Sequence, residues 1–125
     1  MTSIYLLDED RLFLREVESC LGNGSIAVRK AFTCYTATGP LAHADDGAVF
    51  VVGEWLAEGS ALPVIHWLAG RHARFIVLSR LRSEIAELMY QRLGAFAVLD
   101  RGQPPSMVAQ QIRTTLENAV GKEAN

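Results

Sequence analysis

The sequence predicts one doubly wound α/β domain, in which helices cover both faces of a five-stranded parallel sheet. Two patterns lead to this fold class. Several short apolar runs are continuous and not alternating, which is typical of strands buried on both faces. The segments between these runs change to the 3.6-residue period of amphipathic helices. This order of strands and helices favours right-handed crossovers within a single sheet, and a chain of 125 residues, 50% of them hydrophobic, can bury one core.

Four runs of β-forming residues mark the central strands of the expected sheet. In chain order they are Ile4–Leu7, Ala48–Val52, Phe75–Leu78 and Ala95–Leu99. A weaker run extends from Ala27 to Cys34 and is interrupted by Arg29 and Lys30. Because charged residues are typical of sheet edges, we expect this additional strand, the second in chain order, at an edge.

Apolar stripes at helical spacing predict the connecting helices. The three clear stripes are Phe13/Val17/Cys20/Leu21, Ile85/Leu88/Met89/Leu93 and Val108/Ile112/Thr115/Leu116. Ser83 is a suitable N-cap for the second of these helices, because a serine hydroxyl can accept a bond from a backbone N–H of the first turn. Shorter helices are expected from about Pro63 to Ala69 and around Leu41.

Composition and termini restrict the classes of protein that fit. The domain is expected to occupy residues 1–120, with residues 121–125 forming a frayed tail or the start of a linker. A net charge of −2 argues against direct nucleic-acid binding by this domain. Neither a signal-peptide pattern nor an apolar run near the ~20 residues of a membrane span is visible, so we expect a cytoplasmic protein that does not contact a membrane.

Polar residues follow each predicted strand at its carboxyl end, where ligands bind in open α/β sheets. The fold should bring these distant positions to one mouth. They are Asp8, Glu9 and Asp10 after the first strand, Gly53 and Glu54 after the third, Ser79 after the fourth, and Asp100 and Arg101 after the fifth.

These segments resemble the receiver domains of two-component response regulators. Leu6–Asp10 resembles the acidic pair that holds Mg²⁺, and Ile76–Ser79 resembles the strand whose final hydroxyl residue contacts the phosphoryl group. Gly94–Gly102 is similar to the family signature Gly-Ala-x-x-aromatic-Leu-x-Lys-Pro. The resemblance extends from Ser3 to about Ala119. It implies a flavodoxin-like (βα)5 fold and a role in signal transduction through a two-component system or phosphorelay.

Four departures from the family pattern fall on the phosphorylation switch. Gly53 stands where the family has its phospho-acceptor aspartate, and Val98 stands at the position of the switch aromatic. Arg101 replaces the family's lysine, and Gly102 replaces its proline. Acceptor and switch are both missing, so the departures predict a degenerate pocket that has lost phosphorylation-driven switching.

Arg101 needs another partner if the pocket takes no phosphate. We expect an internal ion pair between Arg101 and Asp8, Glu9 or Glu54, because a guanidinium group suits bidentate contact with a carboxylate. Glu54 would reach the pocket only if a bulge redirected its side chain. Asp8 and Glu9 are weak candidates for Mg²⁺, and neither a metal nor another cofactor is expected.

The favoured interpretation is a non-enzymatic pseudo-receiver, which regulates through protein contact without phosphorylation. The expected interface lies on the helix around Ser83–Leu93, the fifth strand and the helix around Ser106–Asn118, where it would bind a protein partner or form a homodimer. Its exposed charges are Glu84, Glu87, Arg92, Arg113 and Glu117. The chain could be the N-terminal domain of a transcriptional regulator.

Two alternatives remain open at this point. The chain could be a phosphorylatable receiver that uses Glu54 or another acidic residue. It could also be a sensor of an anion or nucleotide that binds through Ser79 and Arg101. The sequence does not identify the partner, the output pathway, the oligomeric state or the signal that replaces phosphorylation.

Overall fold

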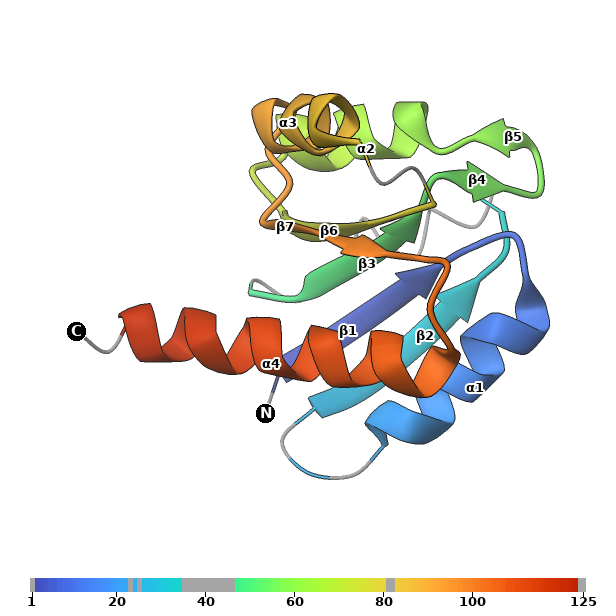
Figure 1. The fold of residues 1–125 in the computed structure, drawn as a ribbon, viewed down its shortest axis with the longest axis vertical. Coiled ribbons are helices and arrows are strands. Elements are labelled where there is room, and N and C mark those ends of the chain that lie inside the picture. Colours follow the sequence, from blue (N-terminus) through green and yellow to red (C-terminus); the bar gives the residue numbers. More distant parts are fainter. Residues whose placement is uncertain (1, 23, 25, 35–46, 81–82, 124–125) are drawn as a thin grey trace.

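The computed structural model describes residues 2–22, 24, 26–34, 47–80 and 83–123. Strands and helices alternate along most of the chain (Figure 1). In order they are β1 (Thr2–Leu7), α1 (Arg11–Leu21), β2 (Ile26–Phe32), β3 (Val49–Gly53), β4 (Trp55–Leu56), β5 (Gly59–Ser60), α2 (Leu62–Gly70), β6 (Arg74–Ser79), α3 (Glu84–Arg92), β7 (Ala97–Asp100) and α4 (Pro105–Glu123).

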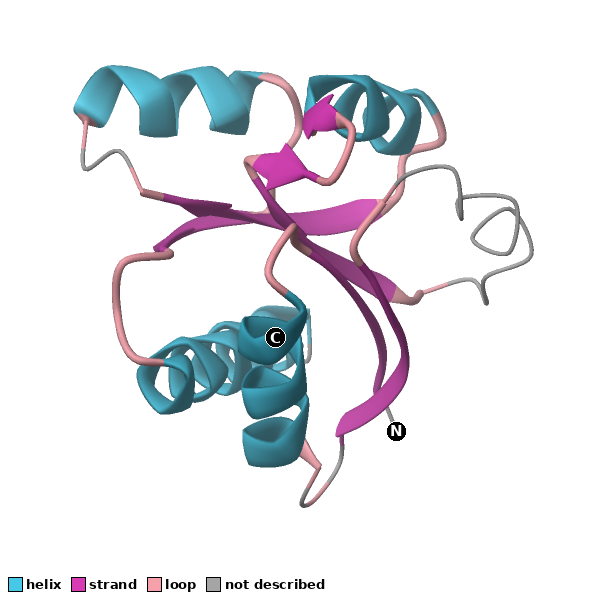
Figure 2. Cartoon of the chain, turned by 90° about the vertical axis from the view of Figure 1, so that its right-hand side faces the viewer, coloured by secondary structure: helices cyan, strands magenta, loops and turns pink. Residues whose placement is uncertain are grey.

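The main sheet has five strands in the order β2-β1-β3-β6-β7, and every adjacent pair is parallel. Helices α1 and α4 cover one face, and α2 and α3 cover the other (Figure 2). This arrangement confirms the doubly wound α/β fold class. The weaker run forms β2, which lies at an edge of the sheet, as its charged residues predict.

Side chains of the central strands alternate between two separate cores. In β3, Val49 and Val51 pack with the side chains of α1 and α4, whereas Phe50 and Val52 pack with those of α2 and α3. All five residues of β3 are buried. A strand that is buried on both faces therefore has a continuous run of hydrophobic residues, and this run identified β3 in the sequence.

Local capping explains where the helices begin. The Asp10 carboxylate accepts a bond from the backbone N–H of Phe13 (3.1 Å) at the start of α1. The Ser83 hydroxyl caps α3 by accepting from the Ala86 N–H (3.4 Å), as predicted. Pro63 lies in the first turn of α2, where its missing N–H removes no helical bond. The helix expected around Leu41 falls outside the described residues.

Several boundaries differ from the sequence expectation; β2, for example, ends at Phe32 and not at Cys34. The last strand begins at Ala97 and not at Ala95, because the Ala95 N–H still bonds to the Tyr90 carbonyl of α3 (3.0 Å). Helix α4 extends to Glu123, into the segment 121–125 for which fraying or a linker is predicted. No helix among the described residues is long and apolar enough to cross a membrane.

Three of the four residues in the predicted apolar stripe of this helix, Ile85, Leu88 and Met89, do not face the sheet. Ile85 is 81% exposed, and Leu88 and Met89 are also exposed. Helix α3 instead packs through Tyr90, which is buried, and Leu93, which is partly buried. Helical spacing thus predicted the helix correctly, but it identified an outward row of apolar side chains and not the packed face.

A short antiparallel hairpin, β4–β5, lies between β3 and α2 and was not predicted. Its strands have two residues each, too few for a period to be visible. Gly59 supplies the positive φ of 134° that the turn requires. Leu56 anchors the hairpin in the core, while Trp55 remains 55% exposed.

Candidate functional site

The carboxyl ends of β1, β3, β6 and β7 meet at one edge of the sheet. They place Asp8, Gly53, Ser79 and Arg101 at a common mouth, although these residues are far apart in the sequence. Asp8, Ser79 and Arg101 are polar residues that are buried. Buried polar groups require partners, so their contacts define what this mouth can do.

Asp8 and Arg101 form a buried, bidentate ion pair. The Arg101 Nε donates to Asp8 Oδ2 (2.9 Å), and a terminal guanidinium nitrogen donates to Asp8 Oδ1 (3.2 Å). The guanidinium carbon lies 3.4 Å from the ring centroid of Phe13, a cation–π contact. Asp10 approaches the same guanidinium more loosely, at 3.8 Å. The expected internal partner of Arg101 is therefore Asp8.

The Asp8 carboxylate occupies the space in front of Gly53. A Cβ atom added at Gly53 would lie 3.0 Å from Asp8 Cγ and even closer to Oδ2, nearer than real Cβ contacts allow. Gly53 is buried, and its φ is not in the left-handed region, so its backbone does not require glycine. The absence of a side chain at this position is what makes room for Asp8.

Glu54 points to a different set of partners. Its Oε1 accepts from the backbone N–H of Arg80 (2.8 Å), and its Oε2 accepts from the hydroxyl of Tyr90 (2.7 Å). Glu54 is thus not the partner of Arg101. Tyr90 was missed in the sequence as a site residue, because it lies in a helix, 36 residues along the chain from Glu54.

The mouth has almost no free volume. The space bounded by Asp8, Glu9, Glu54, Trp55 and Arg101, together with Leu78 and Arg80, measures about 10 Å³, which is about the room needed for a single water molecule.

The residues at the mouth do not fit a magnesium ion. Mg²⁺ prefers an octahedron of oxygens that includes carboxylates, but both Asp8 oxygens already accept bonds from Arg101. Gly53 supplies no carboxylate, and Glu9 is exposed. Within the part of the chain that the structure describes, no group of three or more His, Cys, Asp or Glu side chains is placed to hold a metal ion.

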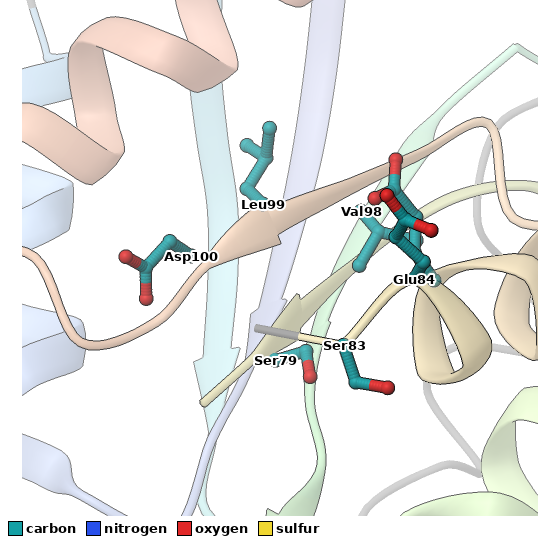
Figure 3. Close-up of a pocket in the computed structure, with 7 residues that line it drawn as sticks. Ser79, Ser83, Glu84, Val98, Leu99 and Asp100 are labelled. Carbon is teal, nitrogen blue, oxygen red and sulfur yellow. The ribbon is translucent and has the colours of Figure 1, made fainter. Parts of the chain in front are cut away.

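A larger, open cavity of about 300 Å³ lies beside the mouth, between β7 and the start of α3 (Figure 3). Figure 3 shows Val98 of β7 beside Glu84 of α3. The other lining residues are Ser79, Ser83, Glu87, Leu99 and Asp100. The predicted switch position, Val98, therefore borders an open space that its small side chain does not fill.

Burial raises the pKa of Tyr90 far above its ordinary value of 10.0, and the bond to Glu54 and the negative charge of that carboxylate raise it further. A raised pKa means that Tyr90 stabilises the fold fully below pH 10.0, and that this contribution is lost as the pH rises toward its folded pKa. We expect the free energy of unfolding to fall above about pH 10 with a slope from Tyr90 of up to ~1.4 kcal/mol per pH unit.

The Tyr90→Phe variant should lack this slope in urea unfolding curves recorded from about pH 9 to about pH 11. Tyr5→Phe is the matched control for removal of a tyrosine hydroxyl, since the Tyr5 ring stacks on Phe50. If stability fell with the same slope in the wild-type chain and in Tyr90→Phe, Tyr90 would not be the group responsible for the fall.

Comparison with known proteins agrees with this architecture. No protein-family model and no curated protein sequence matches the chain. Solved structures do match. A Francisella response-regulator receiver domain is 13% identical with a TM-score of 0.78, over 95% of this chain and 99% of that one. A receiver-domain protein from Clostridium thermocellum is 14% identical with a TM-score of 0.76, over 99% and 98%.

The response regulator RcsB of Salmonella typhimurium is 14% identical with a TM-score of 0.74, and its structure is described in terms of DNA interaction. The match covers 94% of this chain but only 60% of the RcsB chain. Such low identities establish the fold and not the activity. The chain has the fold of response-regulator receiver domains.

Proposed function

We propose that the chain is a receiver-like signalling module that acts through protein contact and is not phosphorylated. One observation carries this proposal. The Asp8 carboxylate, held by Arg101, fills the space in front of Gly53 where an acceptor side chain would project. The Asp8 carboxylate and the Arg101 guanidinium neutralise one another within the chain. Arg101 is therefore already engaged when a phosphoryl group approaches, and Gly53 offers no acceptor side chain.

The two alternatives receive less support. A phosphorylatable Glu54 would have to give up its bonds to the Arg80 N–H and the Tyr90 hydroxyl. An anion sensor built on Arg101 would have to break a buried bidentate ion pair, in a mouth with about 10 Å³ of free volume.

Incubation with acetyl phosphate and Mg²⁺, followed by intact-mass measurement, tests the proposal. We expect no phosphoryl adduct on the chain, because Gly53 has no side chain and the carboxylates of Asp8 and Glu54 already accept hydrogen bonds within the chain. A receiver domain that has its acceptor aspartate is the positive control. An adduct mapped to Glu54, Asp8 or Glu9 would overturn the proposal.

We further propose that α3 provides the contact surface and that its occupant is a second copy of the chain. The surface is a row of exposed apolar side chains, Ile85, Leu88 and Met89, of the kind found in the centre of protein interfaces. Glu84 lies in the first turn of α3, and Arg92 lies in the last. Two α3 helices packed antiparallel about a twofold axis would bring Glu84 of each copy to Arg92 of the other.

This apolar row changes the expected character of the interface. Glu84, Glu87, Arg92 and Glu117 are exposed, as the sequence suggested. The fifth charge of that set, Arg113, instead donates to the Cys20 carbonyl of α1 (2.9 Å) and is only partly exposed. The proposed interface is therefore apolar at its centre, with charges at its ends.

Leu88→Glu should convert a dimer to a monomer in sedimentation-velocity experiments, because it places a charge in the middle of the row. We expect dimer affinity to fall about tenfold or more, which corresponds to ~1.4 kcal/mol. Leu12→Glu is the matched control, since Leu12 is 63% exposed on α1 and lies outside the row. Glu84→Arg should also weaken the dimer, and adding Arg92→Glu should restore it. Unchanged association of Leu88→Glu would refute the interface.

The proposal also includes the kind of protein to which this domain belongs. We propose a cytoplasmic, non-enzymatic regulatory domain within residues 1–120, which acts as the N-terminal part of a transcriptional regulator. Support comes from RcsB, which has the same fold in a longer chain. The domain itself is not expected to bind DNA, because its net charge of −2 provides no overall positive field.

A further inference from the structure

We propose that Glu54 is a built-in tie that holds α3 in one fixed position and thereby keeps its apolar row in a binding-competent arrangement without any signal. This inference rests on the proposed function, because it names how the proposed interface is controlled. The Glu54 carboxylate accepts hydrogen bonds from the backbone directly after β6 and from α3, so it holds α3 without any modification of the chain.

The geometry of Glu54 supports the tie. Glu54 follows the last residue of β3 and leads into the β4–β5 hairpin. Its two carboxylate oxygens contact two other elements: Oε1 accepts from the N–H of Arg80, directly after β6 (2.8 Å), and Oε2 accepts from Tyr90 in α3 (2.7 Å). Both bonds are charge-assisted and therefore stronger than bonds between neutral groups. One side chain thus joins three elements of the fold.

The hairpin holds the backbone of Glu54 in place. The Glu54 carbonyl accepts from the N–H of Ala61 (2.9 Å), so the chain returns to Glu54 immediately before α2 begins. Ala61 and Leu56 are both buried. The carboxylate therefore extends from a fixed base, and its bonds constrain α3 more than they constrain Glu54 itself.

Helix α3 has few other contacts to fix its position. Of its nine residues, Tyr90 is the buried one, whereas Ile85, Leu88 and Met89 face outward. Elements that bury little apolar surface open locally at low free-energy cost. The single buried side chain of α3 is also the one whose hydroxyl bonds to Glu54. Loss of Glu54 should therefore loosen this helix more than any other element.

Amide hydrogen exchange measured by NMR tests the tie. In Glu54→Ala, the Arg80 amide and the helical amides of α3 should exchange about ten to a hundred times faster than in the wild-type chain. Glu54→Asp keeps the charge but is one methylene shorter, so it should lose at least one of the two bonds and show the same direction of change. Tyr90→Phe removes only the hydroxyl and should show a smaller increase confined to α3.

Glu16→Ala is the matched control, because Glu16 is exposed on α1, on the opposite face of the sheet. Its α3 amides should exchange at wild-type rates. Wild-type exchange of Arg80 and α3 in both Glu54→Ala and Glu54→Asp would overturn the inference. So would equal acceleration in α3 and in the amides of β1 and α4, because this would indicate global destabilisation.

Association measurements separate this inference from the proposed function. If Glu54 controls the interface, Glu54→Ala should weaken self-association, and Leu88→Glu should abolish it. Faster α3 exchange with unchanged dimer affinity would overturn the control by Glu54 and leave the interface intact. A wild-type chain that is monomeric at all concentrations would contradict the interface, while the exchange rates alone would still decide whether Glu54 holds α3.

Discussion

Arg101→Met is expected to lower the free energy of unfolding by about 3–5 kcal/mol, because it leaves the buried Asp8 carboxylate without its cationic partner. Asp8 is 3% exposed, and both of its oxygens accept bonds from Arg101. Arg101→Lys should cost less, since it keeps the positive charge but loses the bidentate geometry and the planar contact with Phe13. Urea unfolding of the three proteins measures the difference.

A double-mutant cycle with Asp8→Asn isolates the ion pair from general packing. The double variant Asp8→Asn/Arg101→Met should be more stable than the sum of the two single losses predicts. Arg15→Met is the control, because Arg15 is exposed on α1 and a surface change of this kind should stay within about 0.5 kcal/mol. Additive single losses would show that Asp8 and Arg101 do not stabilise one another.

Gly53→Ala is expected to cost about 1–3 kcal/mol, because its single added carbon overlaps the Asp8 carboxylate in a closely packed site. Gly70→Ala is a closely matched control. Gly70 ends helix α2, has no atom within 4 Å of an added Cβ and does not have a positive φ. Alanine there should be neutral or stabilise by about 0.4–1 kcal/mol. Both values follow from urea unfolding, and equal effects of the two substitutions would refute the overlap.

Gly53→Asp should be less stable than Gly53→Ala, because it adds a second carboxylate to the space that Asp8 occupies. We expect this variant to remain unphosphorylated by acetyl phosphate, because the new side chain competes with Asp8 for Arg101 and the mouth has no spare volume. Efficient phosphorylation of Gly53→Asp would show that one residue alone had closed the pocket.

The fold could be predicted from the sequence because its central strands are buried on both faces. The runs at Ile4–Leu7 and Phe75–Leu78 lie within β1 and β6, and the topology of a parallel sheet then places their carboxyl ends together. The same reasoning gathered Asp8, Gly53 and Arg101 at one mouth. It also indicated that Arg101 would need a carboxylate partner.

Other features depend on side-chain geometry that a linear pattern does not contain. Three carboxylates were candidate partners for Arg101, and only the side-chain geometry identifies Asp8 as the partner. Tyr90 was missed, since its hydroxyl reaches Glu54 across 36 residues of sequence. The outward direction of Ile85 could not be read from spacing, because a helical stripe has the same period whether it faces a sheet or solvent.

The overlap at Gly53 also bears on how the site could change by mutation. A side chain at residue 53 and the present position of Asp8 exclude one another, and Asp8 in turn satisfies Arg101. Introducing an aspartate at residue 53 therefore requires coordinated replacements, because the single substitution is expected to give a less stable protein. Gly53, Asp8 and Arg101 depend on one another, so this site is difficult to change by one substitution at a time.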